Sequence, residues 1–314
     1  MIEATLVDAI TYSSLLAIMS FGLTLVRITT NVWNVAHAAA VTVGAYVIYT
    51  CVSFMGGSPY LYLPFAFVIC AFISVGLYLL VVEPLRKRGA SSTMILVATI
   101  AADLVFLSII NIFADYLQKV FKLPSKNFLL RNLDFTMFGL PGIGWASLLF
   151  LIGLLILLNI MLKYTKIGLA LRACVSNASL ASISGINVKY VYTISWLLAG
   201  GLAGVAGGLL TLWIQGNPVL GDSLVATMFC VSILGGLKEI YGTVFGAYLT
   251  GFAQILTTTA LSQVLGVWVI PYKALIPMVI LVLALLFVPE GITGTNWRRV
   301  LQKFRTGGWL KRKA

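Results

Sequence analysis

The sequence predicts an all-α, polytopic bundle of about eight or nine transmembrane helices. Of its 314 residues, 60% are apolar and only 10% are charged, whereas a soluble domain carries about 25% charged residues. Apolar runs of about 20 residues, the length that crosses a bilayer as a helix, recur along the chain. Only helices and closed barrels satisfy their own backbone in lipid. These runs are too long and too continuously apolar for barrel strands, so we expect helices.

Nine apolar runs give the expected helices in chain order. The run at 223–234 is short for a full span, so a re-entrant segment is an open alternative there. The runs are Leu6–Ile28, Ala36–Met55, Tyr60–Val82, Thr93–Phe113, Ile143–Leu162, Tyr190–Ile214, Ser223–Leu234, Tyr241–Leu261 and Val267–Phe287.

The basic residues predict the orientation of these spans. The net charge of +12 gathers in three clusters, at Arg86–Arg88, Lys163–Lys189 and Arg298–Lys313. By the positive-inside rule all three face the cytoplasm, and an odd number of crossings then places the N-terminus outside. We expect residues 1–297 to form one transmembrane domain. We expect residues 298–314 to form a basic cytoplasmic tail that meets anionic lipid rather than nucleic acid.

The polar break at 163–189 between two apolar runs predicts a structured helical elbow. It is too polar for lipid, yet too rich in alanine and leucine for a disordered linker. Ser176 or Asn177 can cap a short helix through a side-chain oxygen, and Gly185 can end it in the left-handed conformation. Such an elbow on a membrane protein suggests a docking site for a soluble partner.

Polar residues in the first half suggest a solute path. Asn31, Asn34 and His37 recur three apart, so in a helix they would share a face. An ordinary cytoplasmic turn explains them, and a broken helix lining a path is the alternative. Asp103 lies within an apolar run, where a carboxylate is costly unless paired or hydrated. It is either an acceptor for a cationic solute group or a structural partner of other polar groups.

Glycines predict tight helix packing in the second half. Spacings of four place them on one helix face, where neighbouring backbones approach closely. They are Gly200, Gly204 and Gly208 in one run and Gly242 and Gly246 in another.

The sequence lacks the motifs of an enzyme. It has no G-x-x-x-x-G-K-[ST] loop for ATP and no Ser/His/Asp constellation. Its single histidine falls short of a metal ligand set. We therefore expect no catalytic residue, no metal and no cofactor in this chain.

Four segments together resemble the permease subunits of branched-chain amino acid ABC transporters. They are N-V-A-H-A (Asn34–Ala38), the elbow R-A-C-V-S-N-A-S-L-A-S-I-S-G-I-N-V (Arg172–Val188), L-G-G-L-K-E-I-Y-G-T-V-F-G-A-Y-L-T-G (Leu234–Gly251) and V-P-E-G-I-T-G (Val288–Gly294). They are spread in family order across most of the chain. The chain departs from the pattern at Val35, Ala38, Asn177 and Asp103, which leaves the solute open.

The resemblance implies a multi-pass permease in a prokaryotic inner membrane. A second, similar or identical permease, two cytoplasmic ATPases that hold ATP and magnesium, and an external solute-binding protein would complete the importer. The solute would be a branched-chain or related amino acid, or a small amide such as urea. The rivals are a stand-alone ion-coupled carrier or channel for a small polar solute, and a membrane-embedded enzyme or lipid-handling scaffold.

The resemblance also implies roles for particular residues. The elbow would couple ATPase closure to the bundle, and the external segment 115–142 would meet the binding protein. The coupling residues would be Arg172, Ala173, Ser176, Asn177, Gly185 and Ile186, and the docking residues Lys119, Lys122 and Lys126.

Overall fold

Eight helices of the described structure are long and apolar enough to cross a membrane. The computed structural model describes residues 2–137, 139–236, 241–287 and 291–292. The spans are Thr5–Thr30, His37–Met55, Pro59–Lys87, Ser92–Val120, Gly142–Tyr164, Val188–Leu210, Gly242–Leu265 and Val267–Leu286, with a shorter apolar helix at Leu220–Gly235. The predicted polytopic helical bundle is confirmed, and the run at 223–234 is the short one.

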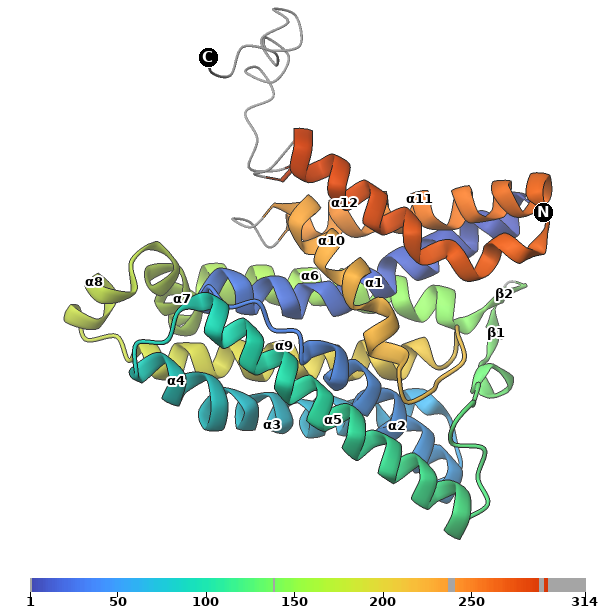
Figure 1. The fold of residues 1–314 in the computed structure, drawn as a ribbon, viewed down its shortest axis with the longest axis horizontal. Coiled ribbons are helices and arrows are strands. Elements are labelled where there is room, and N and C mark those ends of the chain that lie inside the picture. Colours follow the sequence, from blue (N-terminus) through green and yellow to red (C-terminus); the bar gives the residue numbers. More distant parts are fainter. Residues whose placement is uncertain (1, 138, 237–240, 288–290, 293–314) are drawn as a thin grey trace, which may run out of the picture.

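The elements follow one another with short connections (Figure 1). They are α1 (Ile2–Thr30), α2 (His37–Met55), η1 (Pro59–Tyr62), α3 (Leu63–Leu77), η2 (Tyr78–Val82), α4 (Glu83–Lys87), α5 (Ser92–Val120), η3 (Arg131–Leu133), β1 (Thr136–Met137), β2 (Leu140–Pro141), α6 (Gly142–Tyr164), α7 (Lys166–Ser176), α8 (Ala178–Ile183), α9 (Val188–Leu210), α10 (Leu220–Gly235), α11 (Gly242–Leu265), η4 (Val267–Ala274) and α12 (Leu275–Phe287). The two strands form a small antiparallel hairpin that pairs Met137 with Leu140.

The bundle has two distinct ends. Helices α4, α7 and α8 lie at one end, and the β1–β2 hairpin lies at the other (Figure 1). At the first end the guanidinium of Arg86 lies 4.6 Å over the ring of Tyr192, near the start of α9. The Arg86–Arg88 cluster and the elbow are therefore on the same side, as their charges predict. The tail at 298–314 lies outside the described residues.

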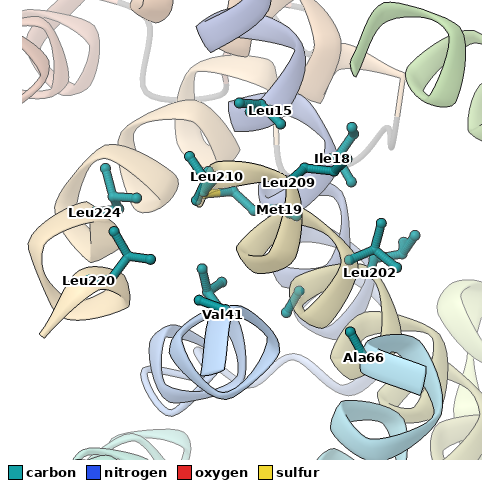
Figure 2. Close-up of a cluster of buried hydrophobic side chains, with 14 of the residues drawn as sticks. Leu15, Ile18, Met19, Val41, Ala66, Leu202, Leu209, Leu210, Leu220 and Leu224 are labelled. Carbon is teal, nitrogen blue, oxygen red and sulfur yellow. The ribbon is translucent and has the colours of Figure 1, made fainter. Parts of the chain in front are cut away.

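The core forms where α1, α2, α3, α9 and α10 meet, with aliphatic side chains from all five elements (Figure 2). Three glycines on one face of α9 allow this close approach. A Cβ on Gly200 would lie 2.5 Å from the Cys70 carbonyl oxygen, and one on Gly204 would lie 2.6 Å from that of Ala66. A Cβ on Gly208 would lie 2.6 Å from Cγ1 of Ile48. The glycine face of α9 thus packs against α3 and α2.

Candidate functional site

Helix α2 begins inside the bundle rather than at its surface. After α1 ends at Thr30, the chain runs back without helical structure over 31–36. His37, the first residue of α2, donates from Nε2 to the Met19 carbonyl oxygen at 2.8 Å. Met19 lies about 16 Å before the end of α1 at the helical rise of about 1.5 Å per residue. The start of α2 is therefore near the middle of the first span.

Helix α10 begins at the same depth but enters from the opposite end. The segment before it pairs with segment 115–142, since the amides of Phe128 and Gly216 each donate to the other residue's carbonyl oxygen, at 3.0 and 2.7 Å. Gly221, in the first turn of α10, then donates its amide to Oγ1 of Thr42 at 2.9 Å. Its Cα approaches α2 so closely that an added Cβ would lie 2.6 Å from the carbonyl carbon of Ala38. The N-terminal turns of α2 and α10 therefore meet inside the bundle.

Two carboxyl groups lie where these helices meet. Asp103 of α5 accepts a hydrogen bond from the backbone amide of Ala39, in the first turn of α2. Its carboxyl group also interacts directly with that of Asp222, which lies in the first turn of α10. Each helix N-terminus carries about half a positive charge, so both carboxylates are favourably placed.

A small cavity adjoins the start of α2. It is lined by the polar residues Asn34, His37 and Ser74 and by apolar residues at position 36 and of α2, α3 and α5, and its volume is about 10 Å³. That volume holds about one water molecule, so the space is closed to an amino acid in this conformation. Asn34 and His37 are each 2% exposed, and Asn34 Oδ1 and His37 Nδ1 find no hydrogen-bond partner among the described residues.

Asn31 lies apart from the other candidate path residues. It is exposed, it adopts a positive φ of 56°, and its carbonyl oxygen accepts from Arg27 and from Ser92 Oγ. Residues 31–36 are not helical, so the common helix face that the spacing of Asn31, Asn34 and His37 would give does not form. Asn34 and His37 line one cavity, while Asn31 ends α1 at the surface.

The elbow consists of two short helices, α7 and α8. The Asn177 side chain caps α8 by accepting from the amide of Leu180 at 3.0 Å, and Gly185 follows α8 with a φ of 84°. Both expectations are confirmed. A further cap, at Thr165, starts α7 by accepting from the amide of Gly168 at 3.1 Å.

The elbow is anchored on one face and open on the other. Leu171, Cys174 and Ala181 are buried, and α7 packs against α1, α6 and α9. The open face carries the large apolar side chains of Leu180 and Ile183, which are 60% and 84% exposed. Of the coupling candidates, Arg172, Ser176, Asn177 and Gly185 are exposed, and Ala173 and Ile186 are half-buried.

The three candidate docking lysines lie at the opposite end of the bundle. Lys119 is in the last turn of α5, and Lys122 and Lys126 follow that helix. All three are exposed, and Lys126 forms an ion pair with Asp115 at 2.7 Å. The segment 115–142 therefore begins as a continuation of α5 and ends with the hairpin.

The other two glycines that the sequence singles out lie where α10 meets α11. A Cβ on Gly246 would lie 2.5 Å from the Val231 carbonyl oxygen, and one on Gly235 would lie 2.6 Å from the carbonyl carbon of Gly242. Within the described residues, no group of three histidine, cysteine, aspartate or glutamate side chains is placed to hold a metal ion.

Asp222 is the site residue that sequence reasoning missed. It follows the segment G-N-P-V-L-G at 216–221 and precedes the short apolar run. In many transporters a short hydrophobic segment, or one interrupted by glycine and proline, marks the binding site. That signal was available, but it does not reveal that Asp222 meets Asp103.

Comparison with known proteins gives consistent matches. The profile of a family described as "Branched-chain amino acid transport system / permease component" matches residues 5–285. The probable branched-chain amino acid transport permease protein LivH of Methanocaldococcus jannaschii is 40% identical over 298 residues, 95% of this chain and 94% of that protein.

Two bacterial relatives are more distant. The high-affinity branched-chain amino acid transport system permease protein LivH of Escherichia coli K12 is 33% identical over 138 residues, 44% of this chain and 42% of that protein. The corresponding protein BraD of Pseudomonas aeruginosa is 26% identical over 300 residues, 92% of this chain and 94% of that protein. No solved structure matches the chain significantly.

Proposed function

The chain belongs to the branched-chain amino acid transport permease family. From this premise we propose which of its surfaces contact the ATPase and the binding protein, and where the solute crosses. It is the permease component of a branched-chain amino acid ABC transport system, a multi-pass membrane protein of a prokaryote. It is not the catalytic subunit, and permeases of this family carry no cofactor. Such a system includes partner ATPases and a binding protein.

The elbow is the ATPase contact. Ile183 and Leu180 present large apolar side chains at the tip of a polar protrusion, and an exposed apolar cluster with a polar rim is typical of a protein interface. Arg172, on the neighbouring helix α7, can donate to carboxylate or carbonyl groups of the partner. This exposed apolar tip, outside the spans, is the observation that carries the proposal.

The elbow can transmit movement because it is rigidly joined to the bundle. A Cβ on Gly168 would lie 2.5 Å from the Cα of Leu162, so the start of α7 packs directly against the backbone at the end of α6. Helix α7 also packs against α1 and α9, and α1 holds His37 at the start of α2. Closure of the ATPases moves the elbow, and the elbow moves the helices that surround the small cavity.

The solute crosses beside the start of α2, and the binding protein docks at the opposite end. The cavity with Asn34 and His37 has a volume of about 10 Å³, so the surrounding helices must separate for an amino acid to pass. Lys119, Lys122 and Lys126 face the carboxylates of the binding protein, because opposite surface charges steer association. A second, similar permease completes the importer.

The test replaces Ile183 with aspartate and compares it with a matched control. Ile183→Asp places a charge on the apolar tip, and we expect about a 30-fold or greater loss of affinity for the ATPase, as for an interface hot spot. Leu133→Asp makes the same change at an exposed apolar residue at the opposite end of the bundle and should leave the affinity unchanged. Affinity is measured by co-purification and titration in detergent. Equal ATPase binding by both variants would refute the coupling role of the elbow.

A further inference from the structure

Two helices that point their N-termini at one place concentrate positive charge there. The first turns of α2 and α10 are in direct contact, through the Gly221 amide and Thr42 Oγ1 at 2.9 Å. Each N-terminus contributes about half a positive charge. The two carboxyl groups of Asp103 and Asp222 exceed this by about one negative charge when both are ionised. One monovalent cation at the meeting point would therefore balance the charge.

Among the described residues, no lysine or arginine forms an ion pair with either carboxyl group. The ion pairs of the described residues join Lys87 to Glu83 and Lys126 to Asp115, and neither involves the meeting point. Asp103 is only 9% exposed, and its Oδ1 finds no hydrogen-bond donor among the described residues. Two carboxylates this close repel each other unless a cation or a proton lies between them.

The neighbouring unpartnered atoms are acceptors as well. The His37 Nε2 must carry the ring proton, because the Met19 carbonyl oxygen can only accept. His37 Nδ1 is therefore a free acceptor, and Asn34 Oδ1 is another. A buried acceptor without a donor is costly. Three such atoms around the first turn of α2 match a ligand rich in N–H donors, and an ammonium group carries three.

We propose that Asp103 and Asp222 together bind the ammonium group of the amino-acid solute where α2 and α10 meet. The proposal rests on the proposed function, since it takes the solute to be an amino acid. Asn34 and His37 accept from the same solute as it passes the first turn of α2. A solute that lacks the ammonium group leaves the carboxylate pair uncompensated and is rejected.

The experiment uses the full chain in complex with its ATPase partner in nanodiscs. Binding of labelled leucine is measured by scintillation proximity and is competed with 2-hydroxy-4-methylpentanoate, in which a hydroxyl replaces the ammonium. We expect leucine to compete at least 10-fold better than the hydroxy acid. Asp103→Asn and Asp222→Asn should each weaken leucine binding by about 10- to 100-fold, the loss that follows removal of one partner of a charged hydrogen bond. In each variant, the affinities for leucine and for the hydroxy acid should also differ less than they do in the wild type.

The control is Asp115→Asn, which removes a carboxylate from the same helix α5 away from the meeting point and should bind leucine as the wild type does. Equal competition by leucine and the hydroxy acid in the wild type overturns the proposal, because the pair then holds a proton or a metal cation. Undiminished leucine binding in both asparagine variants overturns it as well. The ligand comparison in the wild type needs no variant to fold. Failure of the wild-type chain to assemble with an ATPase would instead refute the proposed function.

Discussion

Replacement of Gly221 with alanine tests whether α10 packs directly against the backbone of α2. Alanine at this position would place a Cβ in contact with the Ala38 carbonyl oxygen, 2.6 Å from the Ala38 carbonyl carbon and 2.8 Å from Thr42 Oγ1. Non-bonded carbon atoms normally approach to about 3.5–4.0 Å, so the two helices must separate by roughly 1 Å. The obstructing atoms of Ala38 belong to the backbone and cannot rotate away.

The expected cost follows from these contacts. Overpacking of a close helix crossing costs about 1–3 kcal/mol, and separation weakens the bond from the Gly221 amide to Thr42, worth about 1 kcal/mol. We expect Gly221→Ala to lower the free energy of unfolding by about 2–4 kcal/mol and to reduce transport more than the loss of folded protein explains.

The assay is reversible unfolding in mixed micelles, followed by tryptophan fluorescence, with transport measured in parallel. The matched control is Gly153→Ala in α6, where an added Cβ would meet no atom within 4 Å. That change should be neutral or stabilise by up to about 1 kcal/mol, since alanine favours the helix. If Gly221→Ala is as stable and as active as Gly153→Ala, the two helices do not meet closely and the reasoning fails.

Three further predictions concern the two ends of the bundle. Arg172→Glu should reduce ATP-driven uptake at least 10-fold while the purified chain unfolds as the wild type does, and unchanged uptake would remove Arg172 from the coupling contact. Reversal of charge at Lys119, Lys122 and Lys126 should abolish the stimulation of uptake by the binding protein, together with the salt dependence of that stimulation. Intact stimulation would locate the docking surface elsewhere. Burial raises the pKa of the Cys174 thiol, and its side chain is 3% exposed. Because a raised pKa lowers the thiolate fraction, maleimide should label Cys174 far more slowly than an exposed cysteine at Ser182→Cys. Labelling should accelerate as pH rises, and equal rates at pH 7 would contradict its burial.

The helices could be predicted because a chain in lipid must satisfy its backbone hydrogen bonds internally. Runs such as Thr93–Phe113 are long and apolar, and their backbone must be satisfied internally. The structure extends this run to Val120, past Asp115 and Lys119, because a helix continues beyond the apolar stretch where its side chains reach water. The caps of the elbow could also be predicted, since Asn177 and Gly185 act within a few residues of their own position.

The depth of α2 and the Asp103–Asp222 pair could not be predicted from local patterns. Whether 31–36 forms a surface turn or runs back into the bundle depends on the bond from His37 to Met19, which joins residues of different elements. Asp103 stands out in the sequence as a charge in an apolar run. Asp222, at the edge of a run, does not. Their meeting follows from the packing of α5, α2 and α10.

The most direct test of the account is uptake of labelled leucine into proteoliposomes that contain the chain with or without its ATPase partner. Uptake should require the ATPase, the binding protein and ATP together, because the chain has no nucleotide-binding loop of its own and the cavity beside the start of α2, about 10 Å³, is too small for an amino acid. Equilibration of leucine by the chain alone would contradict the account and identify a stand-alone carrier.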